Sequence, residues 1–273
     1  MLKERLLTVA VLLPLFVGTM FYAPNTVWGA VMGMATAAGA IEWARLCGLA
    51  RNGQALFAAL VAASAAAWLV AAALPAWQPL SLSALQPLLG LAVLFWVVVA
   101  PCWLYFGWQV KSRGPLLAVG WLVLVPAWLA VTVLQQRPVL LLLALSVVWL
   151  ADTAAYLVGR RFGRHKLAPL ISPGKTIEGL IGAYGMVLIY ALIVSVVLRP
   201  AASGADRVAL LILALVLTTL GVAGDLFESW MKRRTGAKDS GHLLPGHGGV
   251  LDRIDSMTSA MPFAALYLMQ GAA

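Results

Sequence analysis

The sequence predicts an all-α fold, a polytopic bundle of about nine transmembrane helices with its N-terminus in the cytoplasm. Three observations support this class. Hydrophobic residues make up 62% of the 273 positions, charged residues make up 11%, and the mean hydropathy is +0.93, whereas soluble globular proteins are about 45–50% apolar. The apolar runs are continuous and long enough to cross a bilayer as helices, without the alternation of a membrane β-barrel. Basic residues are distributed unevenly among the connections.

The order of the apolar runs defines the expected elements. Residues 1–22 begin like a signal peptide, but no small-residue cleavage site follows, so we expect a retained first helix. Pro and Gly interrupt the later connections, as residues that end helices do. No connection is long enough to separate domains, which predicts one integral membrane domain over 1–273, with N-terminal helices in 1–135 and catalytic helices and cytoplasmic loops in 136–273. The expected helices are approximately Leu6–Tyr22, Val27–Leu46, Ala55–Leu74, Leu82–Phe106, Leu116–Leu134, Val139–Val158, Ile177–Leu198, Val208–Met231 and Val250–Met269.

The basic residues predict how these helices are oriented. If all the expected helices cross the membrane, the N-terminus and every second connection share one side, and that side holds sixteen of the 19 Lys and Arg residues. Because basic connections stay in the cytoplasm, we expect the N-terminus inside and the C-terminus outside. Orientation then accounts for the net charge of +9, and we expect no nucleic-acid partner.

Four aspartates lie where a carboxylate is costly. Asp152 and Asp225 lie within apolar helices, each seven or eight residues before a basic end, so they should sit at similar depth. Asp252 and Asp255 are three residues apart at the start of the last helix and share a face. Carboxylates inside a membrane are typically functional, and Mg²⁺ binds carboxylate and phosphate oxygens. We therefore expect Mg²⁺ at Asp225, Asp252 and Asp255, with Asp152 as a further candidate ligand and room for a second cation.

A structural role is the alternative for these acids. They would then pair with Arg253, Lys175 or other basic residues of the loops and hold helices together. For Glu42 and Glu228 both interpretations remain open from the sequence alone. For the three aspartates the ligand interpretation is favoured, because they come from two helices joined by one short polar loop.

That polar loop has the composition of an anion-binding site. Pro-Gly-His-Gly-Gly at 245–249 leads directly into the last helix. Glycines let backbone N–H groups approach an anion, and the helix dipole adds to the attraction. Lys232, Arg233 and Lys238 lie earlier in the loop segment and can neutralise phosphate oxygens, and His247 can donate a hydrogen bond. We expect phosphate groups to bind here.

A second basic segment covers 160–166 and continues through Ile-Ser-Pro-Gly-Lys-Thr-Ile-Glu-Gly at 171–179. We expect Ser172 to Gly174 to form a turn, with Lys175 and Thr176 binding phosphate at the start of the next helix. Gly-Lys-Thr is shared with P-loops, but the upstream glycine spacing and the preceding strand are missing, which excludes a Walker A motif. Anchoring to anionic lipid head groups is the alternative for 160–166.

The segment from Ser229 to Asp255 resembles the sequence signature of the phosphatidate cytidylyltransferases, also called CDP-diacylglycerol synthases. The stretch at 171–179 is similar to another segment of that family. The resemblance covers a little under half of the chain, at its C-terminal end, and the N-terminal helices agree only in being apolar. The residues that meet the signature are Ser229, Lys232, Arg233, Lys238, Asp239, Gly241, Pro245, His247, Gly248, Gly249, Asp252, Arg253 and Asp255.

The resemblance implies a homodimeric enzyme of the bacterial inner membrane that uses Mg²⁺ and CTP, with its active site facing the cytoplasm. It would transfer CMP to phosphatidic acid, a membrane lipid, giving CDP-diacylglycerol and pyrophosphate. The lipid phosphate can be its own nucleophile, because the second pKa of a phosphate monoester is about 6. The protein then has to align two anions and neutralise charge, and no Ser–His or Cys–His pair is needed.

Roles within this reaction follow from the resemblance and the residue types together. The candidate catalytic residues are Lys238, Asp239, Arg253 and Lys175, and Asp239 would position either a lysine or the cytosine base. The candidate substrate-binding residues are Ser172, Lys175, Thr176, Ser229, Lys232, Arg233, Lys238, His247, Gly248 and Gly249.

Two other functions are compatible with parts of the sequence. A CTP-dependent polyprenol or lipid kinase would use a similar site but transfer the γ-phosphate. An ion or anion transporter would also carry carboxylates inside a helix bundle. The polar residues of this chain gather at one side of the membrane and not at its midplane, which opposes the transporter.

Overall fold

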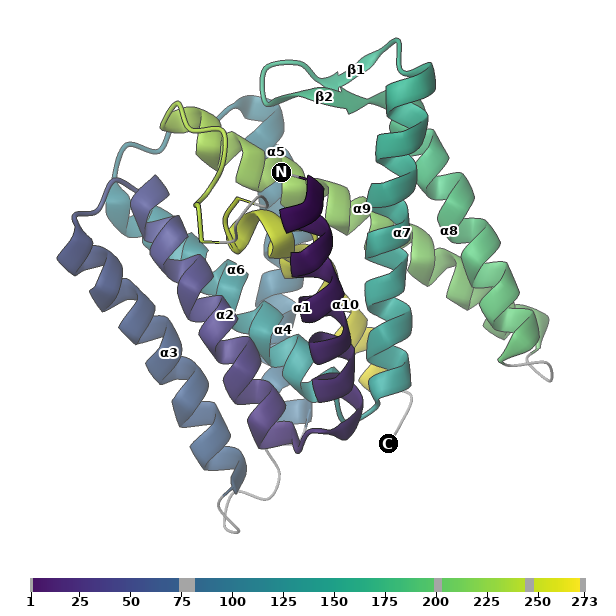
Figure 1. Cartoon of the computed structure of the whole chain (residues 1–273), viewed down its shortest axis with the longest axis horizontal. Coiled ribbons are helices and arrows are strands. Elements are labelled where there is room, and N and C mark those ends of the chain that lie inside the picture. The colour runs from purple at the N-terminus through teal and green to yellow at the C-terminus, as the bar shows by residue number, and fades with distance from the viewer. Residues whose placement is uncertain (1, 74–81, 199–202, 244–247, 271–273) are drawn as a thin grey trace.

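The computed structural model describes residues 2–73, 82–198, 203–243 and 248–270. Over these residues the protein is a bundle of helices with a short β-hairpin at one end (Figure 1). The elements in chain order are α1 (Leu2–Tyr22), α2 (Asn25–Leu46), α3 (Arg51–Ala73), α4 (Leu82–Leu94), the π-helix η2 (Phe95–Val99), α5 (Ala100–Phe106), α6 (Arg113–Leu134), α7 (Pro138–Phe162), β1 (Lys166–Ala168), β2 (Ser172–Thr176), α8 (Ile177–Val197), α9 (Gly204–Arg234) and α10 (Leu251–Gln270).

The helices lie where the apolar runs predict them, and the fourth predicted helix consists of α4, η2 and α5 in succession. Among the described residues, six helices are long and apolar enough to cross a bilayer, so the chain is an integral membrane protein. Nine crossings and a cytoplasmic N-terminus stay predictions. The six spans are Arg51–Ala71, Leu85–Phe106, Arg113–Leu134, Pro138–Phe162, Ile177–Val197 and Gly204–Arg234.

The predicted all-α bundle is confirmed with one small addition, the β-hairpin, which corrects the prediction of a turn at Ser172 to Gly174. Strands β1 and β2 pair antiparallel, with Lys166 opposite Thr176 and Ala168 opposite Ser172. The chain reverses at 169–171 instead, so the Ser-Pro-Gly stretch lies in β2. A proline and a glycine are tolerated there because a two-stranded sheet consists only of edge strands. The prediction that the next helix starts after Lys175 and Thr176 is confirmed.

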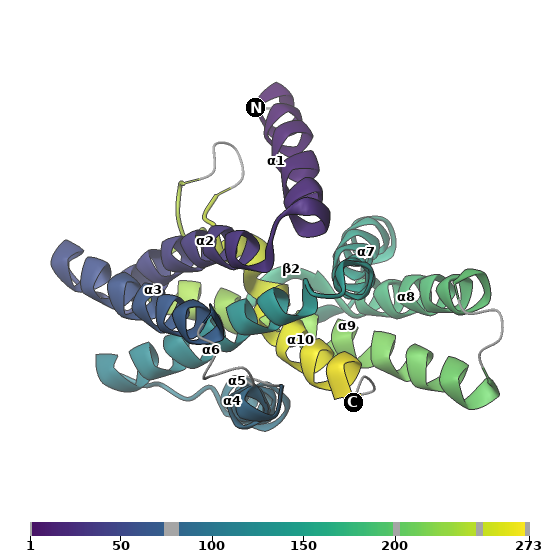
Figure 2. The ribbon, with the colours of Figure 1, turned by 90° about the horizontal axis from the view of Figure 1, so that it is seen from below.

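Helix α10 lies in the interior of the bundle and packs against α2, α4, α6, α7 and α9. Figure 2 shows α2 and α3 on one side of it and α8 and α9 on the other. Close contact with α9 depends on Gly224, because a Cβ there would meet the backbone oxygen of Asp255 and Ser259 Oγ. Ser259 Oγ also donates to the backbone oxygen of Leu220 at 2.7 Å. The two helices that carry the predicted metal ligands are therefore fixed against each other.

A cluster of aromatic rings fixes α9 to the N-terminal helices. The ring of Phe227 lies 5.4 to 6.3 Å from those of Trp43, Phe95, Trp96 and Trp103. All five side chains are buried, and such offset and edge-on pairs contribute about 0.5–1.5 kcal/mol each beyond burial. The cluster holds α2 next to the end of α9, where the polar residues of both helices meet.

Candidate active site

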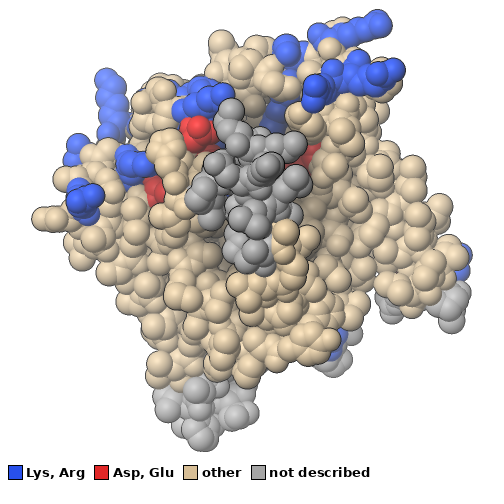
Figure 3. Space-filling model, viewed as in Figure 1, with Lys and Arg blue, Asp and Glu red and all other residues tan. Residues whose placement is uncertain are grey.

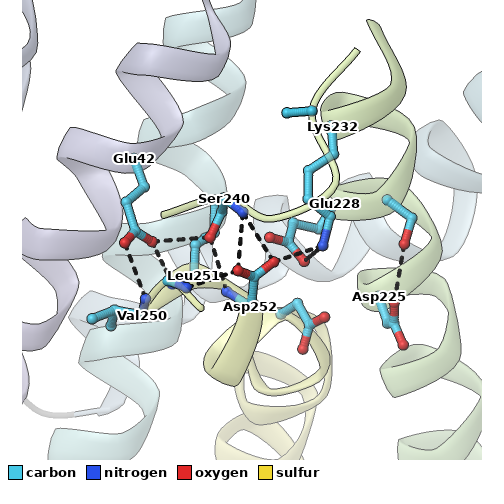
Figure 4. A network of polar contacts seen from close by, with 12 residues as sticks. Glu42, Asp225, Glu228, Lys232, Ser240, Val250, Leu251 and Asp252 are labelled. Atoms are coloured by element: carbon cyan, nitrogen blue, oxygen red, sulfur yellow. Dashed lines mark hydrogen bonds and ion pairs between the residues drawn. The ribbon is translucent and has the colours of Figure 1, made fainter. Parts of the chain in front are cut away.

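Glu42 brings the N-terminal half of the chain into the polar site. Its carboxylate lies on α2, is 4% exposed and accepts hydrogen bonds from Ser240 Oγ at 3.0 Å, Val250 N at 3.1 Å and Leu251 N at 2.8 Å (Figure 4). The N–H groups at a helix start have no partner within the helix. Glu42 therefore caps α10 from another helix and fixes the loop that precedes it.

Asp252, in the first turn of α10, binds both α9 and residues of the same loop. Its carboxylate accepts hydrogen bonds from Lys232 Nζ at 2.7 Å, Ser240 N at 2.9 Å and Gly249 N at 2.9 Å. Lys232 Nζ also donates to Glu228 at 3.1 Å, so the lysine bridges two acids (Figure 4). We refer to Glu42, Glu228, Lys232, Ser240 and Asp252 as the loop-anchoring network.

The loop-anchoring network explains the small residues of the signature. A Cβ on Gly241 would overlap the Glu42 carboxylate, and a Cβ on Gly249 would meet both Glu42 and Ser240 Oγ. Gly248 has a φ of +83° and lies against Asp252, and this left-handed conformation is costly for residues with a Cβ. These three glycines are required so that the backbone can approach two carboxylates closely.

A second set of acids gathers beside this network, from α7, α9 and α10. Asp225 pairs with Lys175 Nζ at 2.6 Å and accepts a hydrogen bond from Ser229 Oγ at 3.2 Å. Asp152 interacts electrostatically with Asp225 and Lys175, and Asp255 interacts with Asp152 and Asp225. The structure thus brings together Asp152 and Asp225, as their predicted similar depth requires. We refer to Asp152, Asp225 and Asp255 as the aspartate cluster.

The β-hairpin places Lys175 over the aspartate cluster. Glu178 accepts hydrogen bonds from Arg164 N at 3.0 Å and His165 N at 3.2 Å, and it contacts His165 Nδ1 at 2.6 Å. Thr176 Oγ1 caps α8 by accepting from Gly179 N at 3.1 Å. Because these contacts hold the C-terminal end of β2 at the start of α8, the Lys175 ammonium is directed toward Asp225.

The hairpin also contacts the signature segment directly. Arg233 Nε donates to the backbone oxygen of Ile171 at 3.1 Å, and its Nη1 donates to that of Ala237 at 3.3 Å. The segments 171–179 and 229–255 are therefore in contact and form two walls of one polar site. Arg233 was predicted to bind substrate, and here it connects the two walls.

The remaining predicted residues lie at the same end of the molecule. Lys238, Asp239 and Arg253 are exposed, and Ser172 is half-buried on β2. His247 lies outside the described residues. Figure 3 shows that most of the Lys and Arg visible on this face gather at the end of the molecule that carries the hairpin.

The carboxylates provide the oxygen atoms that Mg²⁺ prefers, although no three His, Cys, Asp or Glu side chains in the described part of the chain are arranged to hold a metal ion. Two features still fit a cation. Glu228 Oε1 is buried without a hydrogen-bond partner among the described residues, and its carboxylate lies beside Asp255. Lysine ammonium groups contact Asp225 and Asp252, so both carboxylates already bind a positive charge. Since Mg²⁺ is commonly held by one or two carboxylates plus substrate phosphates, the donor set is suitable.

The sequence leaves the role of Glu42 open and assigns none to Ser240 or Glu178, and all three residues organise the site. The signal for Glu42 was a carboxylate inside an otherwise apolar helix, which requires a partner. Its partners lie some two hundred positions away in the chain, so only the fold shows what it binds. Ser240 had no signal, because a serine in a polar loop is common.

Taken together, the site combines ammonium and guanidinium groups, a helix start and accessible carboxylates at one end of a membrane helix bundle. These groups suit the binding of phosphates and of a divalent cation, and among the residues described no serine or cysteine side chain is hydrogen-bonded to a histidine. The fold and site define a membrane-embedded enzyme of phosphate chemistry, and sequence comparisons identify its family.

The chain belongs to the cytidylyltransferase family, whose model matches residues 3–270. A phosphatidate cytidylyltransferase of Pseudomonas aeruginosa is 39% identical over 99% of this chain and 98% of its own length. Proteins of the same name from Staphylococcus haemolyticus and Haemophilus influenzae are 49% and 46% identical over 48% and 47% of this chain, and the matches cover 49% and 45% of their own lengths.

Proposed function

We propose that this protein transfers CMP from CTP to phosphatidate, giving CDP-diacylglycerol and pyrophosphate in phospholipid biosynthesis. The observation that carries the proposal is the match to the Pseudomonas phosphatidate cytidylyltransferase, which extends over nearly the whole of both chains. The geometry supports it, because Ser229, Lys232 and Asp252 of the signature lie in one polar site where ammonium groups pair with carboxylates.

The basic residues of the site have separate roles in the proposed reaction. Lys175 and Lys232 each contact a carboxylate, which holds their ammonium groups in place to neutralise phosphate oxygens. Arg253 and Lys238 are exposed at the same end of the bundle and can bind further phosphates. Alignment of two anions with neutralisation of the leaving pyrophosphate is the main requirement of such a transfer. The attacking group is the lipid phosphate itself, so the protein need not remove a proton to generate it.

We propose that the aspartate cluster, together with Asp252, holds Mg²⁺. The bound ion would supply neutralisation of the charge on the triphosphate. Asp152 is exposed, and Asp225 and Asp255 are half-buried, which leaves these three carboxylates able to share the ion with substrate oxygens. Asp252 already accepts three hydrogen bonds, so it would exchange one of them for the ion.

The location of the site suits its two substrates. Since CTP is cytosolic and the phosphate of phosphatidate lies at the head-group level, we propose that the hairpin end faces the cytoplasm of a bacterial inner membrane. The concentration of basic residues at this end (Figure 3) supports that orientation by the positive-inside rule. We also propose that the protein is a homodimer, as the family resemblance implies.

A product assay tests the proposed function. Purified protein is incubated with phosphatidate labelled in its glycerol, CTP and MgCl₂, and the products are separated. We expect labelled CDP-diacylglycerol and pyrophosphate in equal amounts. Formation of CDP without CDP-diacylglycerol would instead identify a CTP-dependent lipid kinase. Chelation with EDTA should stop turnover, and activity that persists in EDTA would remove the metal from the proposal.

A further inference from the structure

An apolar cavity of about 380 Å³ lies beside the site, bounded by α1, α2, α6, α7 and α10. Its volume is within the ~300–1,000 Å³ typical of small-molecule sites. Residues of the loop-anchoring network and the aspartate cluster do not line it. Arg253, next to Asp252 in the first turn of α10, does. The cavity therefore has one cationic edge that adjoins the catalytic end of the bundle.

The walls of the cavity keep their polar atoms away from its interior. Thr36, Thr258, Trp28 and Trp128 all line it, and each donates a hydrogen bond of 2.6 to 3.0 Å to a backbone carbonyl within the walls. Because these donors are satisfied, what the cavity offers to a ligand is aliphatic and aromatic surface. Such a surface favours hydrocarbon over water or a nucleotide.

The cavity extends away from the catalytic end. On α2 its lining runs from Thr36 to Trp28, which is roughly 12 Å along a helix axis at about 1.5 Å per residue. Glu42, farther along α2, contacts the start of α10, so Thr36 lies at the catalytic end and Trp28 at the far end. A ligand that fits has an anionic group near Arg253 and an alkyl chain toward Trp28.

We propose that this cavity holds an acyl chain of the phosphatidate substrate, with the lipid phosphate at Arg253. The proposal rests on the proposed function for the identity of the lipid. It assigns chain recognition to α1, α2 and α6, the half of the molecule that carries no part of the signature. Charge complementarity and continuity with the polar site favour a substrate lipid over a second copy of the protein, which would need no cation at this edge.

Helix α1 provides the side through which a lipid can arrive. Its Phe16 ring packs edge-on against Trp28 and Trp149, with centroids 5.2 and 6.1 Å apart. Figure 2 shows α1 projecting from the rest of the bundle. Since α1 projects, its wall is the side of the cavity that faces the surrounding bilayer, where the chains of phosphatidate lie.

Filling the cavity tests the proposal. Ala35 lines it on α2, whereas Ala30 lies on the same helix with an exposed side chain. We expect Ala35→Phe to raise the KM for dioleoyl-phosphatidate relative to dihexanoyl-phosphatidate by about tenfold, as loss of fit in an apolar pocket does. Ala30→Phe should leave this ratio as it is in the wild type. An unchanged ratio in Ala35→Phe would overturn the proposal.

A binding measurement separates this proposal from the proposed function. Wild-type protein in nanodiscs is exposed to phosphatidate with a photoactivatable diazirine in one acyl chain, and labelled peptides are mapped by mass spectrometry. We expect label on residues 32–36 and 254–258, and less of it in Ala35→Phe. Label confined to outward-facing helices such as α3 and α8 would overturn the cavity assignment. Label in the cavity without CDP-diacylglycerol formation would keep the cavity and reject the proposed reaction.

Discussion

The loop-anchoring network and the aspartate cluster lie side by side but differ in exposure and in hydrogen bonding. The Asp252 and Lys232 side chains are 8% and 11% exposed, whereas those of Asp225 and Lys175 are 30% and 23% exposed. Glu42 and Asp252 together accept five hydrogen bonds from the loop and the start of α10, four from backbone N–H groups and one from Ser240 Oγ. In the aspartate cluster, carboxylates face one another and one lysine.

This difference indicates how work is divided within the site. A buried carboxylate that accepts hydrogen bonds from its own chain fixes the conformation of the backbone around it. Removing one partner leaves a buried polar group without a hydrogen bond, which lowers stability. Accessible carboxylates that repel one another lower the stability of the protein until a cation binds. The comparison therefore predicts that substitutions in the cluster reduce activity and that substitutions in the network reduce stability.

The largest effect is expected in the aspartate cluster. Asp225→Asn should reduce the rate of CDP-diacylglycerol formation by about 10²–10³-fold, as loss of one preorganised electrostatic group does. Its melting temperature should change little, because repulsion among the acids is relieved. The matched control is Asp206→Asn, at the opposite end of α9 in the capping box, which should keep full activity. An active Asp225→Asn variant would contradict the assignment of the cluster.

Among substitutions that disturb the loop-anchoring network, the strongest effect on folding is expected from Gly249→Ala. The added Cβ would meet Ser240 Oγ, a Glu42 oxygen and the backbone of Gly241, and such overpacking costs about 1–3 kcal/mol. We expect a lower melting temperature in detergent and faster proteolysis of the loop at 235–250. Gly185→Ala on α8 is the control, since nothing lies within 4 Å of its Cβ position. Equal stability of the two variants would show that the close contact is not required.

Glu42→Gln tests whether the N-terminal half holds the catalytic loop. The amide group would place an N–H₂ against Ser240 or the start of α10, leaving buried donors without an acceptor at a cost of about 1–3 kcal/mol. Hydrogen exchange should accelerate at Val250 and Leu251, whose backbone N–H groups donate to Glu42. If exchange there stayed at the wild-type rate, Glu42 would not be the anchor. Activity should fall in proportion to the fraction of molecules with an open loop.

The sequence was sufficient for the membrane class, the positions of the helices and the family, because each depends on local patterns. Each apolar run predicts one helix without reference to the others, and the signature of the family lies within one contiguous segment. The hairpin was missed because Ser172, Pro173 and Gly174 have turn propensity, while their strand conformation depends on pairing with β1. The role of Glu42 could not be predicted for a related reason, since its partners are set by how α2 packs against α10 and not by spacing.

The smallest effect is expected between the two walls, at Arg233. Its guanidinium contacts the hairpin through the Ile171 carbonyl oxygen, an exposed hydrogen bond to a charged group worth about 1 kcal/mol. Arg233→Gln should therefore raise the KM for CTP by roughly fivefold with little change in kcat, because the hairpin that carries Lys175 is less well positioned. Arg161→Gln, beside Phe162 at the end of α7, is a control with the same loss of charge. A fall in kcat without a change in KM would place Arg233 at the transferred phosphate and not in the connection between the walls.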